Sequence, residues 1–237
     1  PSKQAIETFK KSQYNIGVYP DGNHSALRLA IADVMGINAD RIICGAGSDE
    51  LIHFLCQCFA GKGDEIIHTV HGFAMYRISA LTVGANPIAI PEVERHADIP
   101  GIINACNERT KIIFLANPNN PTGTLIDNVG LNKLADGIPK HTLLVLDGAY
   151  AEYIEKFDGG IALVETRENV FITRTFSKIY GLSSLRVGWG YGPEHVIDAL
   201  QHVKGPFNIS SVGQHVAAAA MQDTEYVENC RKENFIL

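Results

Sequence analysis

The sequence predicts an α/β protein with three α/β/α layers around a mainly parallel, mixed sheet. Short runs rich in β-branched residues alternate along the chain with helix-like segments, a pattern typical of parallel strands joined by crossover helices. The longest apolar runs, such as Ile112–Ala116 and Leu143–Leu146, have the length of buried strands. A chain of 237 residues, with 46% hydrophobic and 19% charged residues, can enclose such a core, and this composition excludes disorder.

The strands and helices can be assigned in order along the chain. The parallel strand candidates are Arg41–Cys44, Glu65–Val70, Pro87–Ile90, Lys111–Ala116, Thr142–Asp147 and Val170–Thr173. A further strand at Arg186–Tyr191 follows a connection too short for a parallel crossover, so we expect it to run antiparallel. Residues 1–40 are expected to form a helix, a turn and a helix. The remaining helices are expected at Asp49–Phe59, Ala74–Thr82, Ile99–Cys106, Asn128–Asp136, Gly160–Thr166, Glu194–Val203, Val212–Met221 and from Thr224 to the end.

Charge and composition exclude several kinds of partner. The net charge is −6 and no basic stripe is present, so we expect no nucleic-acid partner. No apolar run approaches the roughly 18 residues of a membrane helix. The five cysteines include no C-x-x-C pair and are expected to be free thiols in a reducing compartment. The histidines lack ligand spacing, so we expect no metal site. The chain opens without Met or a signal-peptide pattern, and we expect part of a longer, cytoplasmic protein.

Side chains that could carry chemistry follow the strands, where ligands bind in open α/β sheets. The first strand is followed by Gly45-Ala46-Gly47-Ser48-Asp49-Glu50. Glu50 stands where a dinucleotide fingerprint requires its third glycine, which excludes NAD. The free N–H groups of Ser48–Glu50 could bind a phosphate, although such a turn can also serve strand-to-helix geometry alone.

Three later segments also come at the ends of predicted strands: His71-Gly72-Phe73, Asn117-Pro118-Asn119-Asn120-Pro121-Thr122-Gly123 and Asp147-Gly148-Ala149-Tyr150. The Asn/Pro loop is rigid, and its Asn side chains either cap turns or face a ligand. Asp147 ends an apolar strand, where a carboxylate is costly unless a cation meets it; helix capping is the alternative.

The stretch Arg174-Thr175-Phe176-Ser177-Lys178-Ile179-Tyr180 is the most informative. Its apolar neighbours predict a partly desolvated Lys178 with a lowered pKa, as a Schiff-base lysine requires. Arg186 follows, and its planar guanidinium suits an oxyanion.

One cofactor, pyridoxal 5'-phosphate, accounts for all of these residues together. It requires a lysine, a carboxylate facing the ring nitrogen, donors to the phenolic oxygen, an aromatic side chain on the ring face and a phosphate cup. The sequence offers these as Lys178, Asp147, Asn120 with Tyr150, Phe73, and the Gly47–Glu50 turn with Thr175, Ser177 and Arg186.

The same stretches resemble the fold type I superfamily of pyridoxal-phosphate enzymes, and within it the histidinol-phosphate aminotransferase family. The matching stretches are Tyr19-Pro20-Asp21, Gly47-Ser48-Asp49-Glu50-Leu51-Ile52, Ala74-Met75-Tyr76, Asn117–Gly123, Asp147–Tyr150, Thr175-Phe176-Ser177-Lys178 and Gly181–Gly188. The resemblance implies that Lys178 forms the imine with the cofactor and moves the substrate proton. It implies that Asp147 holds the ring nitrogen, and that Asn120 and Tyr150 contact the phenolic oxygen.

For the phosphate, the resemblance implies contacts from the backbone of Ser48 and Asp49 and from Thr175, Ser177 and Arg186. It also implies a homodimer with shared sites, in which Tyr19 reaches the phosphate of the neighbouring subunit. Residues 1–40 would then contribute to the dimer interface, 41–220 would form the cofactor-binding large domain, and 221–237 would begin the helix toward a small C-terminal domain that is missing here. The sequence departs from the family at Gly148, usually Glu, and at Phe73, usually Tyr.

The reaction implied by this resemblance is reversible amino transfer in histidine biosynthesis. L-Histidinol phosphate and 2-oxoglutarate would give imidazole-acetol phosphate and glutamate. Three alternatives remain open from the residues: an aminotransferase for aromatic amino acids, a decarboxylase of a phosphorylated amino acid, and a regulator that has adopted the fold.

Overall fold

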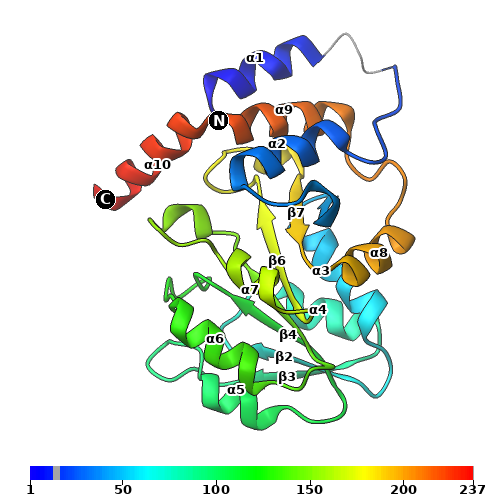
Figure 1. Ribbon diagram of the computed structural model, residues 1–237, viewed down its shortest axis with the longest axis vertical. Coiled ribbons are helices and arrows are strands. Elements are labelled where there is room, and N and C mark those ends of the chain that lie inside the picture. Colours follow the sequence, from blue (N-terminus) through cyan, green and yellow to red (C-terminus); the bar gives the residue numbers. More distant parts are fainter. Residues whose placement is uncertain (13–16, 237) are drawn as a thin grey trace.

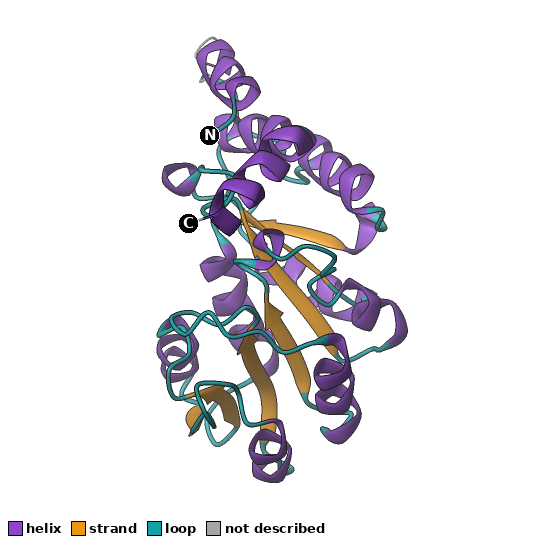
Figure 2. Ribbon diagram, turned by 90° about the vertical axis from the view of Figure 1, so that its left-hand side faces the viewer, coloured by secondary structure: helices purple, strands orange, loops and turns teal. Residues whose placement is uncertain are grey.

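In the computed structural model, which describes residues 1–12 and 17–236, helices cover both faces of one sheet (Figures 1 and 2). The expected N-terminal helix, turn and helix are present as α1 (Lys3–Ser12) and α2 (Ser25–Met35), while residues 13–16 of this segment lie outside the described residues. The last residue of the expected C-terminal helix, 237, also lies outside them. No helix in the described ranges has the length and apolarity needed to cross a bilayer.

The sheet has seven strands in the order β1-β7-β6-β5-β4-β2-β3. The strands are β1 (Ile42–Gly45), β2 (Glu65–Thr69), β3 (Asn86–Ile90), β4 (Thr110–Ala116), β5 (Leu143–Asp147), β6 (Val170–Thr175) and β7 (Gly188–Tyr191). As the short connection predicts, β7 runs antiparallel to both β1 and β6, and the other pairs are parallel. The carboxyl ends of the parallel strands therefore share one edge of the sheet with the start of β7.

Residues that alternate along each strand divide the core into two halves. On β5, Leu144 and Leu146 face one apolar cluster, whereas Leu143 and Val145 face the other. The first cluster lies under α2, α5 (Ile99–Ala105), α6 (Asn128–Gly137), α7 (Ile161–Thr166) and α9 (Ser211–Gln222). The second lies under α3 (Ser48–Phe59), α4 (Met75–Thr82) and α8 (Glu194–Val203). The last helix, α10 (Thr224–Ile236), adds Val227 to the first cluster. The predicted three-layer α/β fold is confirmed.

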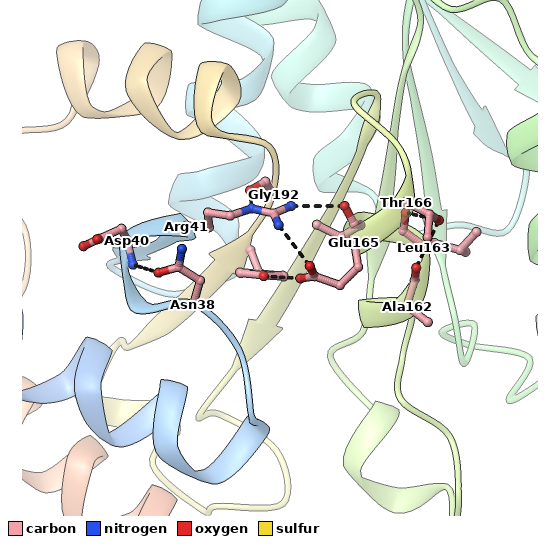
Figure 3. Close-up of polar contacts among 10 residues, drawn as sticks. Asn38, Asp40, Arg41, Ala162, Leu163, Glu165, Thr166 and Gly192 are labelled. Atoms are coloured by element: carbon pink, nitrogen blue, oxygen red, sulfur yellow. Dashed lines mark hydrogen bonds and ion pairs between the residues drawn. The ribbon is translucent and has the colours of Figure 1, made fainter.

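Arg41 fastens the pair of strands β1 and β7 at the edge opposite the carboxyl ends (Figure 3). Its guanidinium donates to the carbonyl oxygens of Gly192 (2.9 Å) and Val164 (3.0 Å) and to the carboxylate of Glu165 (3.2 Å). It also lies over the ring of Tyr191, 4.8 Å from the centroid. These contacts tie both strands to the end of α7 and so hold their register.

His24 is a buried side chain with an unusual backbone at the start of α2. Its φ of 52° and ψ of 37° lie in the left-handed region. Burial, followed by the positive charge of Lys204, lowers the pKa of His24 to about 4. An unfolded histidine titrates near ~6.5, so the unfolded chain takes up this proton first as the pH falls. The stability that the neutral side chain contributes is therefore complete above about pH 6.5 and is lost progressively toward pH 4.

A His24→Asn variant tests this linkage, because asparagine tolerates the left-handed region and does not titrate. Between pH 6.5 and 4, we expect the unfolding free energy of the wild type to fall relative to that of the variant, by at most about 1.4 kcal/mol per pH unit. Urea denaturation at a series of pH values measures the difference. Parallel pH dependences of the two proteins would contradict the assignment.

Candidate active site

A cavity of about 190 Å³ lies at the carboxyl edge of the sheet. Its walls come from the turns after β1, β4, β5 and β6, from the start of α4 and from the segment before β7. Every site residue predicted from the sequence except Tyr19 lines it: Ser48, Asp49, Phe73, Asn120, Asp147, Tyr150, Thr175, Ser177, Lys178 and Arg186. Within residues 1–12 and 17–236, no group of three or more His, Cys, Asp or Glu side chains could hold a metal ion.

Asp147 is the buried acid of this cavity, at the end of the central strand β5. Burial raises the pKa of Asp147, and hydrogen-bond donors, from Tyr76 first and then from Ala149 and Thr173, oppose this effect. The Tyr76 hydroxyl donates to Oδ2 (2.8 Å) and the Ala149 N–H donates to Oδ1 (3.1 Å). In the described part of the chain, no Lys or Arg forms an ion pair with this carboxylate. The short helix that follows, Ala151–Tyr153, has Tyr150 and not Asp147 at its N-cap position. A buried carboxylate without a basic partner calls for a cationic group from a ligand.

Tyr76 is a site residue that sequence reasoning missed. Its buried ring stacks on Phe114, with centroids 4.9 Å apart, and meets the edge of Phe73 at 5.8 Å. Burial and the charge of Asp147 raise the pKa of the Tyr76 hydroxyl well above its usual value, so it remains a donor. It lies three residues after Phe73, at the start of α4, but only the fold brings its hydroxyl to the acid.

The turn after β1 carries backbone N–H groups that could bind an anion. Gly47 has a φ of 85° and a ψ of 167°, a combination that essentially only glycine adopts, and helix α3 begins at the next residue. The first N–H groups of a helix have no partner within it, and the hydrogen bonds of the described residues give those of Ser48, Asp49 and Glu50 no other acceptor. With the positive end of the helix dipole, they favour a phosphate.

Arg186 places a cation beside this turn. Its own backbone is left-handed, with a φ of 52°. The guanidinium donates to the Ser177 hydroxyl (3.2 Å), the Ser183 carbonyl (2.9 Å) and the Asp49 carboxylate (3.1 Å). The Asp49 and Arg186 side chains are 41% and 47% exposed, so their ion pair contributes little and can yield to an incoming anion.

Gly188 allows β7 to pass against the turn. A Cβ at this position would lie 2.4 Å from the Ser48 nitrogen and 2.5 Å from the Gly47 carbonyl carbon. Gly188 pairs with both Gly45 of β1 and Thr175 of β6. It therefore brings the turn after β1 next to the end of β6.

The prediction that apolar neighbours partly cover the Lys178 amine is wrong. Lys178 is exposed at the cavity, with its Nζ 5.4 Å from the centroid of the Tyr150 ring. The neighbours Phe176, Ile179 and Tyr180 are buried in the core under the turn and leave the amine uncovered. In the turn after β6, these apolar side chains point into the core and the lysine lies at the cavity. Residues that are neighbours in the sequence therefore do not contact the amine.

Tyr19 and Gly148 lie away from the cavity floor. Tyr19 is 79% exposed and stacks on Phe207, with centroids 4.7 Å apart. Its predicted contact with a partner subunit stays a prediction. A Cβ on Gly148 would lie 2.9 Å from Nε of the buried Arg174, which is paired with Glu152 at 3.3 Å. A side chain at position 148 would therefore face that pair.

Comparisons with known proteins agree with this geometry. The family model "Aminotransferase class I and II" matches residues 1–235. Histidinol-phosphate aminotransferase of Dinoroseobacter shibae is 58% identical over 99% of this chain, and that of Ruegeria sp. (strain TM1040) is 55% identical over the same share. The chain spans 65% of the length of each of these relatives.

Solved structures give the same result for the fold. The histidinol-phosphate aminotransferase of Sinorhizobium meliloti, in complex with pyridoxal-5'-phosphate, has a TM-score of 0.94 at 25% identity and covers 98% of this chain and 64% of its own. A double mutant of the Thermus thermophilus aspartate aminotransferase has a TM-score of 0.87 at 21% identity, with the same coverage. This second likeness shows the fold alone.

Replacing Gly47 tests the anion site. In Gly47→Ala, the new Cβ would lie 2.5 Å from a terminal nitrogen of Arg186, on a backbone that alanine avoids. We expect stability to fall by about 1–3 kcal/mol and calorimetric titration to show weaker binding of inorganic phosphate. Gly36→Ala is the control, since Gly36 is also left-handed but no atom lies within 4 Å of its Cβ. Equal phosphate affinity of the two variants would contradict the assignment.

Proposed function

The chain belongs to the class I and II aminotransferase family, and from this premise we propose that the protein is a pyridoxal-phosphate-dependent histidinol-phosphate transaminase. It would exchange an amino group between L-histidinol phosphate and 2-oxoglutarate, with glutamate as the donor in the biosynthetic direction. The observation that carries the proposal is the convergence of Lys178, Asp147, Asn120 and Arg186 on one cavity. The substrate is supported by the relatives of that name, which are 50–58% identical to this chain.

The donor set of the cavity fits the cofactor at both of its charged ends. Asp147 is a buried acid without a basic partner in the described chain, and a protonated ring nitrogen would supply one. At the other end, the N-terminus of α3 and the Arg186 guanidinium suit a phosphate. When bound, pyridoxal phosphate supplies an aldehyde that accepts the amino group and a ring that accepts electrons.

The protein's own residues would position and protonate the reactants. Asn120, Tyr150 and Phe73 line the cavity; Asn120 and Tyr150 would donate to the phenolic oxygen, and Phe73 would cover the ring face. The exposed Lys178 would hold the cofactor through its amine, and its Nζ would act as general base at the substrate α-carbon. Its Nζ would return that proton as a general acid. Asp147 would keep the ring nitrogen protonated throughout.

For the whole protein, we also propose a cytoplasmic homodimer with shared sites. Residues 1–40 would contribute to the interface, 41–220 would bind the cofactor, and 221–237 would lead toward a small C-terminal domain. Support for the interface comes from apolar side chains that are largely exposed in the N-terminal segment, namely Val18, Tyr19 and Leu29. Tyr19 would reach the phosphate of the partner subunit.

Lys178→Ala tests the proposed function most directly. We expect the wild type to take up pyridoxal phosphate with a visible absorption band, to convert it to pyridoxamine phosphate with glutamate, and to transaminate L-histidinol phosphate. The variant should lack the band and the activity because no amine replaces Lys178. Release of carbon dioxide from a phosphorylated amino acid would instead indicate a decarboxylase, and failure of the wild type to take up the cofactor would refute the enzyme.

Tyr76→Phe tests the support of Asp147. Loss of the hydroxyl removes one donor from a buried carboxylate, so the pKa of Asp147 should rise further and its charge should weaken. We expect the dissociation constant for pyridoxal phosphate to rise roughly tenfold, the scale of one hydrogen bond to a charged group. Tyr153→Phe, outside the cavity, is the control. Unchanged affinity in Tyr76→Phe, measured by absorbance titration of the apoprotein, would contradict this role.

A further inference from the structure

We propose that Asn208 is a positioning residue for the phosphate-binding turn and that it acts through the carboxylate of Glu50. The inference rests on the proposed function, because that function assigns the turn to the cofactor phosphate. Neither side chain lines the cavity. Both contact the turn from outside the cavity lining, and together they would hold the backbone whose N–H groups are free to bind an anion.

Glu50 lies in the first turn of α3, and its side chain supports the turn after β1. Its Oε2 accepts a hydrogen bond from the Ala46 N–H at 2.7 Å, an arrangement related to the capping box of helix N-termini. A Cβ on Gly45 would lie 3.2 Å from the same oxygen, so glycine leaves room for the carboxylate there. The negative charge stands next to a site for an anion, which is unfavourable for binding. The Glu50 carboxylate therefore contributes by accepting hydrogen bonds that hold the turn in shape, and its charge does not favour the ligand.

Asn208 holds that carboxylate from a distant part of the chain. It lies in the connection between α8 and α9, 158 residues from Glu50, and its Nδ2 donates to Oε2 at 2.6 Å. The same nitrogen approaches the carbonyl of Cys44 in β1, at 3.3 Å. Both partners are acceptors, which fixes the amide with its nitrogen toward them. Asn208 thus links the last part of β1 to the first turn of α3.

The connection that carries Asn208 is itself fixed in place. Lys204 donates from Nζ to the carbonyl of Gly22 at 2.9 Å, and Gln214 donates to the carbonyls of Asp21 (3.0 Å) and Ile209 (3.1 Å). These bonds anchor both ends of the connection. The Asn208 amide is therefore a fixed donor, and Glu50 has a fixed position from which to hold the turn.

The test compares pyridoxal phosphate with pyridoxal, which lacks the phosphate, as probes of the apoprotein. In Asn208→Ala, we expect the dissociation constant for pyridoxal phosphate to rise roughly tenfold, whereas that for pyridoxal stays unchanged. Asn208→Asp, of the same shape, should bind pyridoxal phosphate more weakly still, because two carboxylates would then face each other. Equal losses for both probes, or no loss for either, would overturn the proposal.

Substitutions at Glu50 separate shape from charge. Glu50→Gln keeps an acceptor for Ala46 and Asn208 and removes the charge, so we expect affinity for pyridoxal phosphate equal to or above that of the wild type. Glu50→Ala should lose affinity as Asn208→Ala does. If both Glu50 variants bind more tightly, the side chain acts only as a repelling charge and the proposal fails.

Failure of this positioning role can be distinguished from failure of the proposed function. A wild type that binds neither probe refutes the cofactor assignment, whereas a wild type that binds and Asn208 variants that match it refute only the positioning role. Asn208→Asp is close in size to the native residue and is expected to lose affinity, so it keeps the test decisive if an alanine variant does not fold.

Discussion

The active-site geometry depends on one buried carboxylate at the end of the central strand. Asp147 sits between β4 and β6, where apolar side chains fill both faces of the sheet, and burial opposes its charge. Two donors, from Tyr76 and Ala149, are aimed at its two oxygens and partly offset that cost. The part of the desolvation cost that these hydrogen bonds do not offset favours a cationic ligand atom. Burial of the acid therefore selects for a ligand that places a positive charge next to it.

The approach of Arg186 to the turn after β1 depends on β7, the one antiparallel strand of the sheet among the described residues. Because β7 runs against its neighbours, it begins at the edge where they end, and Arg186 just before it comes to lie beside the turn after β1. Arg41 fixes this pair of strands at the far edge, and Gly188 permits their contact at the near edge. A shift of register by one residue would move Arg186 away from the turn.

The sequence predicts the fold well because its signals are local. Alternating strand and helix patterns locate the elements, and the short connection before Arg186 predicts the direction of β7. Candidate site residues follow from the rule that ligands bind at carboxyl strand ends. The contact of Tyr76 with Asp147 and the role proposed for Asn208 were missed because both depend on contacts between segments that are far apart in the chain. The covering predicted for Lys178 was wrong for the same reason: its apolar neighbours in sequence pack inward, away from the amine.

The distribution of charge in the cavity also restricts the ligand and its orientation. A buried acid marks one end, at Asp147, whereas the N-terminus of α3 and the guanidinium of Arg186 mark the other. A ligand that is anionic throughout would meet repulsion at Asp147, and one that is cationic throughout would meet it at the turn. A flat molecule with a protonated ring nitrogen and a phosphate satisfies both ends in one orientation only. Asn120, Tyr150 and Lys178 line the same cavity, and their polar groups would be partners for the substituents of such a ring.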